Sequence, residues 1–171
     1  MKKMMLVALM ATTLFACKQN ETKTESTETK LGTVTTTGPD VDLLKKSITA
    51  FSNGDWETYA STYADTAKAV HNAWPLSGDS IVGVAMPLLI EGFKKQRTLM
   101  DGNITMGGTI IEVVTMPDGS KWGHVWVELS WKSKAGVPGK SMLFDSYAIK
   151  DGKITFEWPI YDTKDVVKLG Q

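Results

Sequence analysis

The sequence has very little cysteine and no excess of charge of either sign. Cys17 is the only cysteine among 171 residues, so no disulfide can form within the chain. Basic and acidic residues balance at 19 each. A balanced chain gives no electrostatic reason to expect a nucleic acid or another polyanion as a partner.

Several signatures of catalysis and cofactor binding are also missing. The chain has no His/Cys spacing for zinc, no glycine-rich phosphate loop and no Gly-x-Ser-x-Gly nucleophile elbow. We therefore expect no metal and no cofactor. No apolar run reaches the roughly 20 residues that a bilayer-spanning helix needs.

The first 16 residues have the pattern of a secretion signal. Lys2 and Lys3 are followed by residues 4–16, in which only Thr12 and Thr13 are polar. The stretch Leu14-Phe15-Ala16-Cys17 resembles the bacterial lipobox. That resemblance implies cleavage before Cys17, a diacylglycerol on its sulfur and usually an acyl chain such as palmitate on the new terminus.

Such a protein would be a lipoprotein of the cell envelope, anchored to a membrane on the periplasmic side or at the cell surface. Two or three acyl chains would hold it stably, whereas one would not. Cleavage would remove Lys2 and Lys3 and leave 17 basic against 19 acidic residues. The alternative is an ordinary signal peptide that ends near a cysteine.

Residues 18–38 are polar, with only Leu31 and Val34 to bury. This composition predicts disorder. We therefore expect residues 17–39 to be a lipidated cysteine and a flexible tether, and residues 40–171 to be one domain of ordinary size.

Beyond the tether the pattern is helical and then changes to strands. Asp40 is expected to cap a helix with apolar residues at helical spacing that stops at Asn53-Gly54, and Asp55 to cap a second helix that carries Tyr63. Residues 67–74 read as a short strand and residues 77–99 as a helical region that either kinks or starts at Pro87. Four strands are expected at 104–116, 121–133, 141–150 and 153–161, with a bulge at Gly107-Gly108. The order predicts an α+β domain with an antiparallel sheet folded over the helices.

At this point the chain resembles the NTF2-like (SnoaL-like) family. The resemblance covers residues 40–162 and rests on the helical order together with three phrases, Phe51-Ser52-Asn53-Gly54-Asp55-Trp56, Tyr63-Ala64-Asp65 and Asp151-Gly152-Lys153-Ile154. It implies a cone in which a curved, mostly antiparallel sheet wraps N-terminal helices around a pocket, often in a homodimer. The family includes polyketide cyclases, a ketosteroid isomerase, dehydratases and domains without catalysis, so the fold alone does not decide the function.

Hairpin parity predicts which side chains face the pocket. If Asp151-Gly152 is a two-residue turn, Tyr147 pairs with Phe156 and Asp145 pairs with Trp158. These side chains would then share an apolar face in which Asp145 is the one acidic group. A carboxyl group there should have a raised pKa, as acid/base sites require, unless it lies near the mouth of the cone or bonds Tyr147, Trp126 or a backbone amide.

The facing of residues 121–133 stays open, because the loop that follows is long. If Trp122, His124, Trp126 and Glu128 lie inside, the pocket gains an imidazole and a second carboxyl group. If they lie outside, Trp122 and Trp126 form a patch suited to dimerisation. His71 and Trp74 lie on opposite faces of their strand, so at most one of them should line a pocket.

These patterns support three functional hypotheses. The first is a non-catalytic domain that binds a small apolar or amphipathic molecule, and the predicted ligand-binding residues are Tyr63, Trp126, Glu128, Tyr147, Phe156 and Trp158. The second is an acid/base isomerase, cyclase or dehydratase acting on a carbonyl substrate, with Asp145 and His124 as catalytic residues. In many SnoaL-like cyclases the strand after the last turn ends in His-Trp-Asp, but here it reads Glu157-Trp158-Pro159, which disfavours that hypothesis. The third is a dimerising interaction module of the cell envelope.

Overall fold

The computed structural model describes residues 28–29, 31–71, 83–166 and 169. Cys17, Trp74 and most of the predicted tether lie outside this part of the chain, as does the start of the helical region predicted at 77–99.

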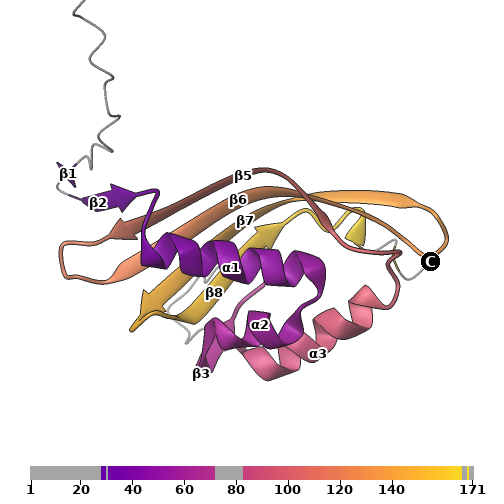
Figure 1. Ribbon diagram of the computed structural model, residues 1–171, viewed down its shortest axis with the longest axis horizontal. Coiled ribbons are helices and arrows are strands. Elements are labelled where there is room, and N and C mark those ends of the chain that lie inside the picture. Colours follow the sequence, from indigo (N-terminus) through magenta and orange to yellow (C-terminus); the bar gives the residue numbers. More distant parts are fainter. Residues whose placement is uncertain (1–27, 30, 72–82, 167–168, 170–171) are drawn as a thin grey trace, which may run out of the picture.

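The described residues form an α+β domain, as predicted, with one curved sheet and three helices (Figure 1). Within this part of the chain the sheet has eight strands in the order β1-β2-β5-β6-β7-β8-β3-β4, and every neighbouring pair is antiparallel except β3 with β8. The helices are α1 (Pro39–Asn53), α2 (Trp56–Ser61) and α3 (Met86–Arg97). The strands are β1 (Glu28–Thr29), β2 (Gly32–Thr35), β3 (Tyr63–Ala69), β4 (Val84–Ala85), β5 (Thr105–Thr115), β6 (Lys121–Lys132), β7 (Pro138–Lys150) and β8 (Lys153–Tyr161).

The helix α1 starts two residues earlier than predicted. Gly38 occupies the cap position and Pro39 the first turn, because the fixed φ of proline suits a first helical residue. Asp40 is therefore not the cap. Its carboxylate instead accepts a 2.6 Å hydrogen bond from the Lys121 Nζ, which joins α1 to β6. The helix stops as predicted at Gly54, whose φ of 71° is left-handed.

The helix α2 is capped by Asp55 as predicted, since its side chain accepts a hydrogen bond from the Thr58 amide. The helix ends at Ser61, so the prediction that Tyr63 lies on it is wrong. Tyr63 instead begins β3, four residues before the predicted strand at 67–74. The reason is tertiary: the Ile154 amide of β8 donates to the Thr62 carbonyl and Tyr63 pairs with Ile154, which draws this segment into the sheet.

The remaining elements follow the sequence pattern closely. Of the two alternatives for Pro87, the structure has the helix start there, with proline in the first turn of α3. The four long strands lie within a few residues of their predicted ranges, and the register shifts between Met106 and Thr109, as the Gly107-Gly108 pair predicted. The prediction of disorder is wrong for Gly32–Thr35, which forms β2 and pairs with the edge of β5.

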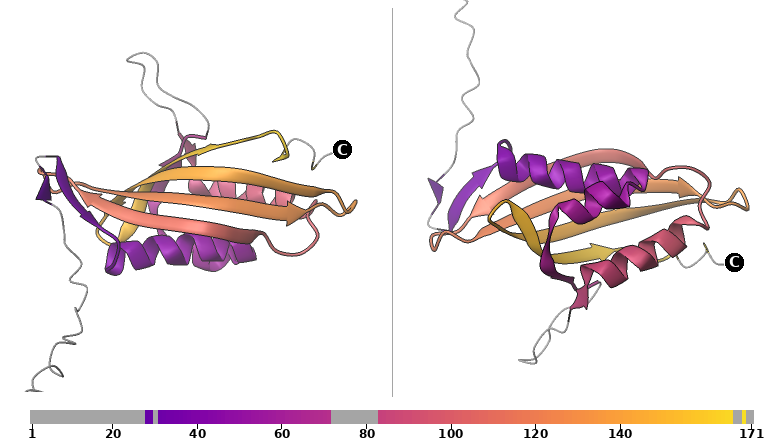
Figure 2. Two further views of the ribbon diagram at one scale, coloured as in Figure 1. Left: turned by 90° about the horizontal axis from the view of Figure 1, so that it is seen from above. Right: turned by 60° about the horizontal axis from the view of Figure 1, so that its bottom comes forward.

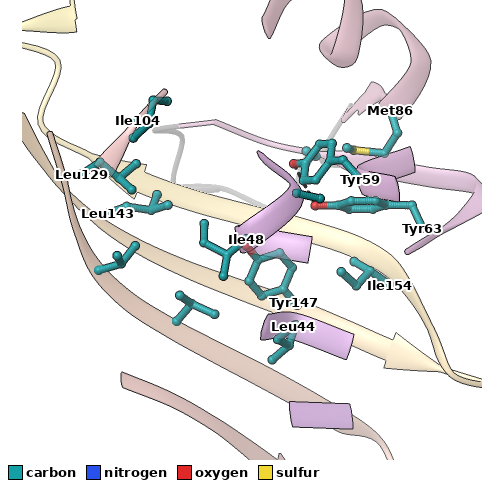
Figure 3. Close-up of a cluster of buried hydrophobic side chains, with 14 of the residues drawn as sticks. Leu44, Ile48, Tyr59, Tyr63, Met86, Ile104, Leu129, Leu143, Tyr147 and Ile154 are labelled. Carbon is teal, nitrogen blue, oxygen red and sulfur yellow. Dashed lines mark hydrogen bonds between the residues drawn. The ribbon is translucent and has the colours of Figure 1, made fainter. Parts of the chain in front are cut away.

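The core lies between the sheet and the helices. α1 packs against β5 and β6, while α3 packs against β3 and α2 (Figure 2). Apolar side chains of the inner sheet face meet the helices, and Leu44, Val125, Val127 and Ile154 are fully buried. At one end of this core the Tyr59 and Tyr63 hydroxyl groups point toward one another (Figure 3). The core thus contains a buried polar region.

Candidate functional site

The hairpin of β7 and β8 decides which side chains reach the interior. Asp151 and Gly152 both have positive φ, 52° and 70°, so the turn is the predicted two-residue turn. The pairs Lys150 with Lys153 and Ile149 with Ile154 also agree with the prediction. The next pair is Ala148 with Phe156, so one extra residue forms a bulge.

This bulge exchanges the two faces of β8. Tyr147 pairs with Glu157 rather than with Phe156, and Asp145 pairs with Pro159 rather than with Trp158. The predicted placement of Phe156 and Trp158 on the pocket face is therefore wrong, because both lie on the outer face of the sheet. Glu157, which the predicted pairing of Phe156 and Trp158 would have turned away from the pocket, points inward beside Asp145.

Of the two faces of β6, the apolar one is turned toward the core, and the face that would have made the pocket polar is turned outward. Val125, Val127, Leu129 and Trp131 are buried on the inner face, so His124, Trp126 and Glu128 lie outside. The His124 Nδ1 lies 3.5 Å from the Glu112 Oε1, and the imidazole stacks on Phe144. The constellation of His124 with Asp145 is therefore not formed, and Trp126 and Glu128 do not reach the interior.

Asp145 and Glu157 form a buried carboxyl pair. Asp145 is 1% exposed and Glu157 is 4% exposed. The Tyr63 hydroxyl donates a 2.6 Å hydrogen bond to the Glu157 Oε2, and the Tyr59 hydroxyl lies 3.4 Å from the same oxygen. The Tyr147 hydroxyl interacts with the Asp145 carboxyl group. Three tyrosines from α2, β3 and β7 thus surround two acids from β7 and β8.

Burial raises the pKa of both carboxyl groups. The pKa of Asp145 is raised well above its ordinary value, first by desolvation and then by the negative charge of Glu157. The pKa of Glu157 is also raised by desolvation, but the hydrogen bonds from Tyr63, Asp145 and Tyr59 oppose that effect. Because hydroxyl donors stabilise an ionised carboxylate, the contacts from Tyr63 and Tyr59 favour the ionised form of Glu157 over that of Asp145.

One atom of the pair has no partner. Among the described residues, no hydrogen bond reaches the buried Asp145 Oδ1. A buried polar atom without a partner costs about 1–3 kcal/mol. It therefore marks a place where a water molecule or a ligand would be stabilised.

A cavity of about 90 Å³ opens beside this atom. Asp145 and Tyr147, two of the residues predicted from the sequence, line it, whereas Tyr63 reaches it only through Glu157. The cavity is lined by helix residues Ile48, Phe51, Tyr59, Phe93 and Gln96, by sheet residues Leu129, Trp131, Ser141, Leu143, Asp145, Tyr147, Glu157, Pro159 and Tyr161, and by His71, Met100, Ile104 and Val166. Pro159 thus faces the cavity.

The indole of Trp131 is positioned by a glycine. Trp131 pairs with Gly139 across β6 and β7, and a Cβ atom at position 139 would lie 2.5 Å from the Trp131 Nε1. Only glycine leaves room for the ring to lie flat over the neighbouring strand. The ring thereby becomes one wall of the cavity.

A wider groove of about 410 Å³ adjoins the cavity along α3. The two share His71, Phe93, Gln96, Tyr161 and Val166, and the groove adds four leucines, Leu88, Leu89, Leu99 and Leu169. The His71 ring lies between those of Phe93 and Tyr161, at 5.7 and 5.9 Å. Burial lowers its pKa, so the imidazole is neutral at neutral pH. Of the predicted pair His71 and Trp74, His71 reaches the pocket.

The described residues contain no cluster of three or more His, Cys, Asp or Glu that could hold a metal ion. Within the same part of the chain, every helix is too short or too polar to cross a membrane.

The outer face of the sheet carries a second set of aromatic residues. One row crosses four strands, from Ile110 through Trp126 and Phe144 to Ile160. The ring centroids of Trp126 and Phe144 are 5.0 Å apart. No described element covers this face, and Ile110 is 62% exposed.

Sequence reasoning missed Glu157 and Tyr59 as site residues. No glycine marks the position of the bulge that turns Glu157 inward, since residues 154–158 read Ile-Thr-Phe-Glu-Trp. Pro159 was an available signal, because proline cannot donate to a ladder and so constrains where a central strand can be regular. Tyr59 lay on the apolar side of its predicted helix but had no visible partner in the sequence.

No protein-family model and no curated protein matches the chain. Solved structures do resemble it. An NTF2-like protein from Burkholderia xenovorans is 15% identical with a TM-score of 0.51, covering 78% of this chain and 96% of that one. IdmH from Streptomyces antibioticus, a candidate polyketide cyclase, is 16% identical with a TM-score of 0.52, covering 76% and 96%.

A third structure is a protein from Catenulispora acidiphila with a ketosteroid isomerase-like fold, in complex with trimethylamine. It is 12% identical with a TM-score of 0.53, covering 75% of this chain and 91% of that one. At these identities the likeness concerns the fold alone. The chain therefore has the NTF2-like fold, a curved sheet that encloses three helices and a small pocket.

Proposed function

We propose that the domain binds a small, largely apolar molecule that hydrogen-bonds to the acid pair in the cavity. The observation that carries the proposal is the unpartnered Asp145 Oδ1, buried at the wall of an otherwise mostly apolar cavity. A ligand group placed there would relieve the cost of the unpaired atom.

The size of the cavity limits the ligand. Pockets for drug-sized molecules have volumes of about 300–1,000 Å³, whereas this cavity has about 90 Å³. An engineered apolar cavity of about 150 Å³ holds one benzene molecule. The inner cavity therefore suits a group of only a few heavy atoms, and any longer part of a ligand would lie in the adjoining groove.

Binding can be tested with a blocked variant. A panel of small alcohols, ketones, lactones and amines is titrated against the wild type and against Leu129→Trp, which fills the cavity, with saturation-transfer NMR as the readout. Glu128→Trp, one residue away on the outer face, is the matched control. Binding that is lost only in Leu129→Trp supports the proposal. If no compound binds, or if the folded blocked variant binds equally well, the proposal is wrong.

A second candidate function is acid/base catalysis on a carbonyl compound. The observation in its favour is the pair of buried carboxyl groups with raised pKa values that face one cavity. In this scheme the Glu157 carboxylate removes a proton from the carbon beside the carbonyl, the Asp145 acid donates its proton to the carbonyl oxygen, and the product is the enol.

Exchange of carbon-bound protons tests this scheme even when the final product is not identified. Ketones are incubated with the protein in D₂O and followed by proton NMR. Glu157→Gln should abolish any exchange catalysed by the wild type, and Glu128→Gln on the outer face should leave it unchanged. Exchange that persists in Glu157→Gln would rule out this carboxylate as the base.

We also propose that the domain is held at a membrane of the cell envelope by lipid on Cys17. The lipobox-like sequence and the basic, apolar start of the chain support this. Cys17→Ser should move the protein from the membrane fraction to the soluble fraction, and mass spectrometry of the wild type should find acyl chains on the residue. Retention of Cys17→Ser at the membrane would contradict the proposal.

We propose, third, that the domain self-associates through the outer face of its sheet. The row of Ile110, Trp126, Phe144 and Ile160 is a contiguous apolar strip on a sheet face that no described element covers. Such a strip suits a second copy of the chain. Light scattering of Ile110→Glu beside the wild type tests this association.

A further inference from the structure

Two carboxyl groups line the cavity, and none of its described lining residues is a lysine or an arginine that could balance a negative charge. When the two acids share one proton, the pair carries one negative charge. The lining residue best able to become a cation is His71, and its burial opposes protonation.

The same cavity is walled by aromatic rings. Phe51 lies 5.6 Å from Tyr59 and 5.2 Å from Phe93 between ring centroids, the latter edge to face. Six aromatic side chains line the cavity in all, Phe51, Tyr59, Phe93, Trp131, Tyr147 and Tyr161. Aromatic faces attract cations, and aromatic cages are a known means of holding substituted ammonium groups.

We infer that the inner cavity is a site for a small organic ammonium group with apolar substituents, held by the negative charge of the Asp145–Glu157 pair and by the surrounding aromatic rings. The inference rests on the proposed function and names its ligand class. An N–H of the ammonium group could donate to the Asp145 Oδ1, which already lacks a donor. Any chain attached to the nitrogen would pass His71 into the groove along α3.

Other ligand classes fit the cavity less well. A carboxylate would face the charge of Glu157 in a poorly hydrated site. A metal cation such as Ca²⁺ takes six to eight oxygen ligands, whereas most of this lining is aromatic or aliphatic. A neutral molecule of the same shape would gain the packing but not the electrostatic attraction.

The charge in the cavity depends on a defined set of titratable groups. These are Asp145 and Tyr147 of β7, Glu157 and Tyr161 of β8, Tyr59 of α2, Tyr63 of β3 and His71. The described lining residues of α1, α3 and β6 carry no charge. Affinity for the ammonium group should therefore fall on acidification, as Glu157 gains a proton.

An isosteric pair of probes separates charge from shape. Choline and 3,3-dimethylbutan-1-ol differ only in a quaternary nitrogen in place of a carbon, and their affinities are measured by calorimetry on the same protein at pH 7.5. Choline should bind at least about tenfold more tightly, because opposite charges attract strongly where little water screens them. Trimethylammonium, which has an N–H, tests the hydrogen bond to Asp145 separately.

The outcomes distinguish this inference from the proposed function. If the neutral alcohol binds as tightly as choline, the pocket is real and the inference is wrong. If neither the two isosteres nor trimethylammonium bind at millimolar concentration, the inference is also wrong, and the proposed function is then decided by the wider panel and the Leu129→Trp variant.

Substitution of the charge provides a second test. In Glu157→Gln, choline and its neutral isostere should bind with about equal affinity, while the affinity for the isostere stays as in the wild type. Glu128→Gln should leave the preference for choline unchanged. If Glu157→Gln does not fold, the pH series on the wild type replaces it. A preference that is constant from pH 8 to pH 5 would overturn the inference.

Discussion

The two faces of the sheet have similar composition and very different surroundings. Each presents tryptophan, phenylalanine or tyrosine together with acidic residues. On the inner face, α1, α2 and α3 pack against the sheet, so that Asp145 and Glu157 are buried in one cavity with tyrosine hydroxyls. On the outer face, Glu112 and His124 lie beside half-buried aromatic side chains and are themselves partly exposed. The acidic residues of the inner face are therefore the more strongly desolvated, and burial raises the cost of an isolated charge.

Truncation of adjacent residues on β7 should show the largest difference between the faces. Leu143 is 8% exposed and Met142 is 55% exposed. Leu143→Ala should lower the free energy of unfolding by about 2–4 kcal/mol, because it leaves a cavity in the core. Met142→Ala should change it by less than about 0.5 kcal/mol. Urea denaturation measures both, and equal losses would mean that the facing of β7 is wrong.

Removal of one hydroxyl group should reveal the charge on Glu157. Tyr63→Phe loses a 2.6 Å hydrogen bond to that carboxylate and should cost about 1.5–3 kcal/mol, the range for hydrogen bonds to charged groups. Tyr59→Phe, whose hydroxyl lies 3.4 Å from the same oxygen, should cost less. The order is checked by thermal and urea unfolding. A larger loss in Tyr59→Phe would show that the two hydroxyls have the opposite roles.

The pH dependence of stability should carry the signature of Asp145. Its pKa is raised by folding, so protonation supports the folded state fully below the ordinary value of 3.8, and this support is lost as the pH rises toward the raised pKa. The stability of Asp145→Asn relative to the wild type should therefore increase between pH 5 and pH 8. Melting temperatures of the two proteins across this range test it. A constant difference would mean that Asp145 is ionised throughout.

The outer face should tolerate a charge with the smallest change in stability. Ile110→Glu at this exposed position should alter the free energy of unfolding by no more than about 0.5 kcal/mol. If copies of the chain associate through this strip, the same change should convert a dimer to a monomer in light scattering of the protein without its lipid. Thr109→Glu, the neighbouring substitution, is the control. A dimer that survives Ile110→Glu would place its interface elsewhere.

Local signals predicted most of the secondary structure. The turn at Asp151-Gly152, the helix stop at Gly54, the cap at Asp55 and the irregularity at Gly107-Gly108 depend on backbone preferences of single residues, and all are present. Errors occurred where a distant strand decided the outcome. Tyr63 left its predicted helix because β8 pairs with it, and Gly32–Thr35 became ordered because the edge of β5 was available.

Only part of the site was predictable from the sequence. Asp145 and Tyr147 were predicted to face a pocket, and they line the cavity. Parity failed beyond Ile154, since a single bulge reverses every later side chain of β8. On the side of β8 that faces the cavity, Glu157 and Pro159 therefore lie where Phe156 and Trp158 were predicted. The sequence left open whether His124 and Trp126 point toward the helices or away from them. The loop after β6 is long, so parity could not be carried across it from β7.

The sequence by itself determined the α+β order, the strand ranges and the presence of an acidic group among apolar residues near the end of the domain, because these depend on local propensity and on alternation. Only the tertiary structure decided that this acid has a second carboxyl group as its partner, that three tyrosines surround the pair and that no described lysine or arginine lines the cavity with them. Those features depend on a bulge and on contacts between residues almost one hundred positions apart, which alternation along one strand cannot encode.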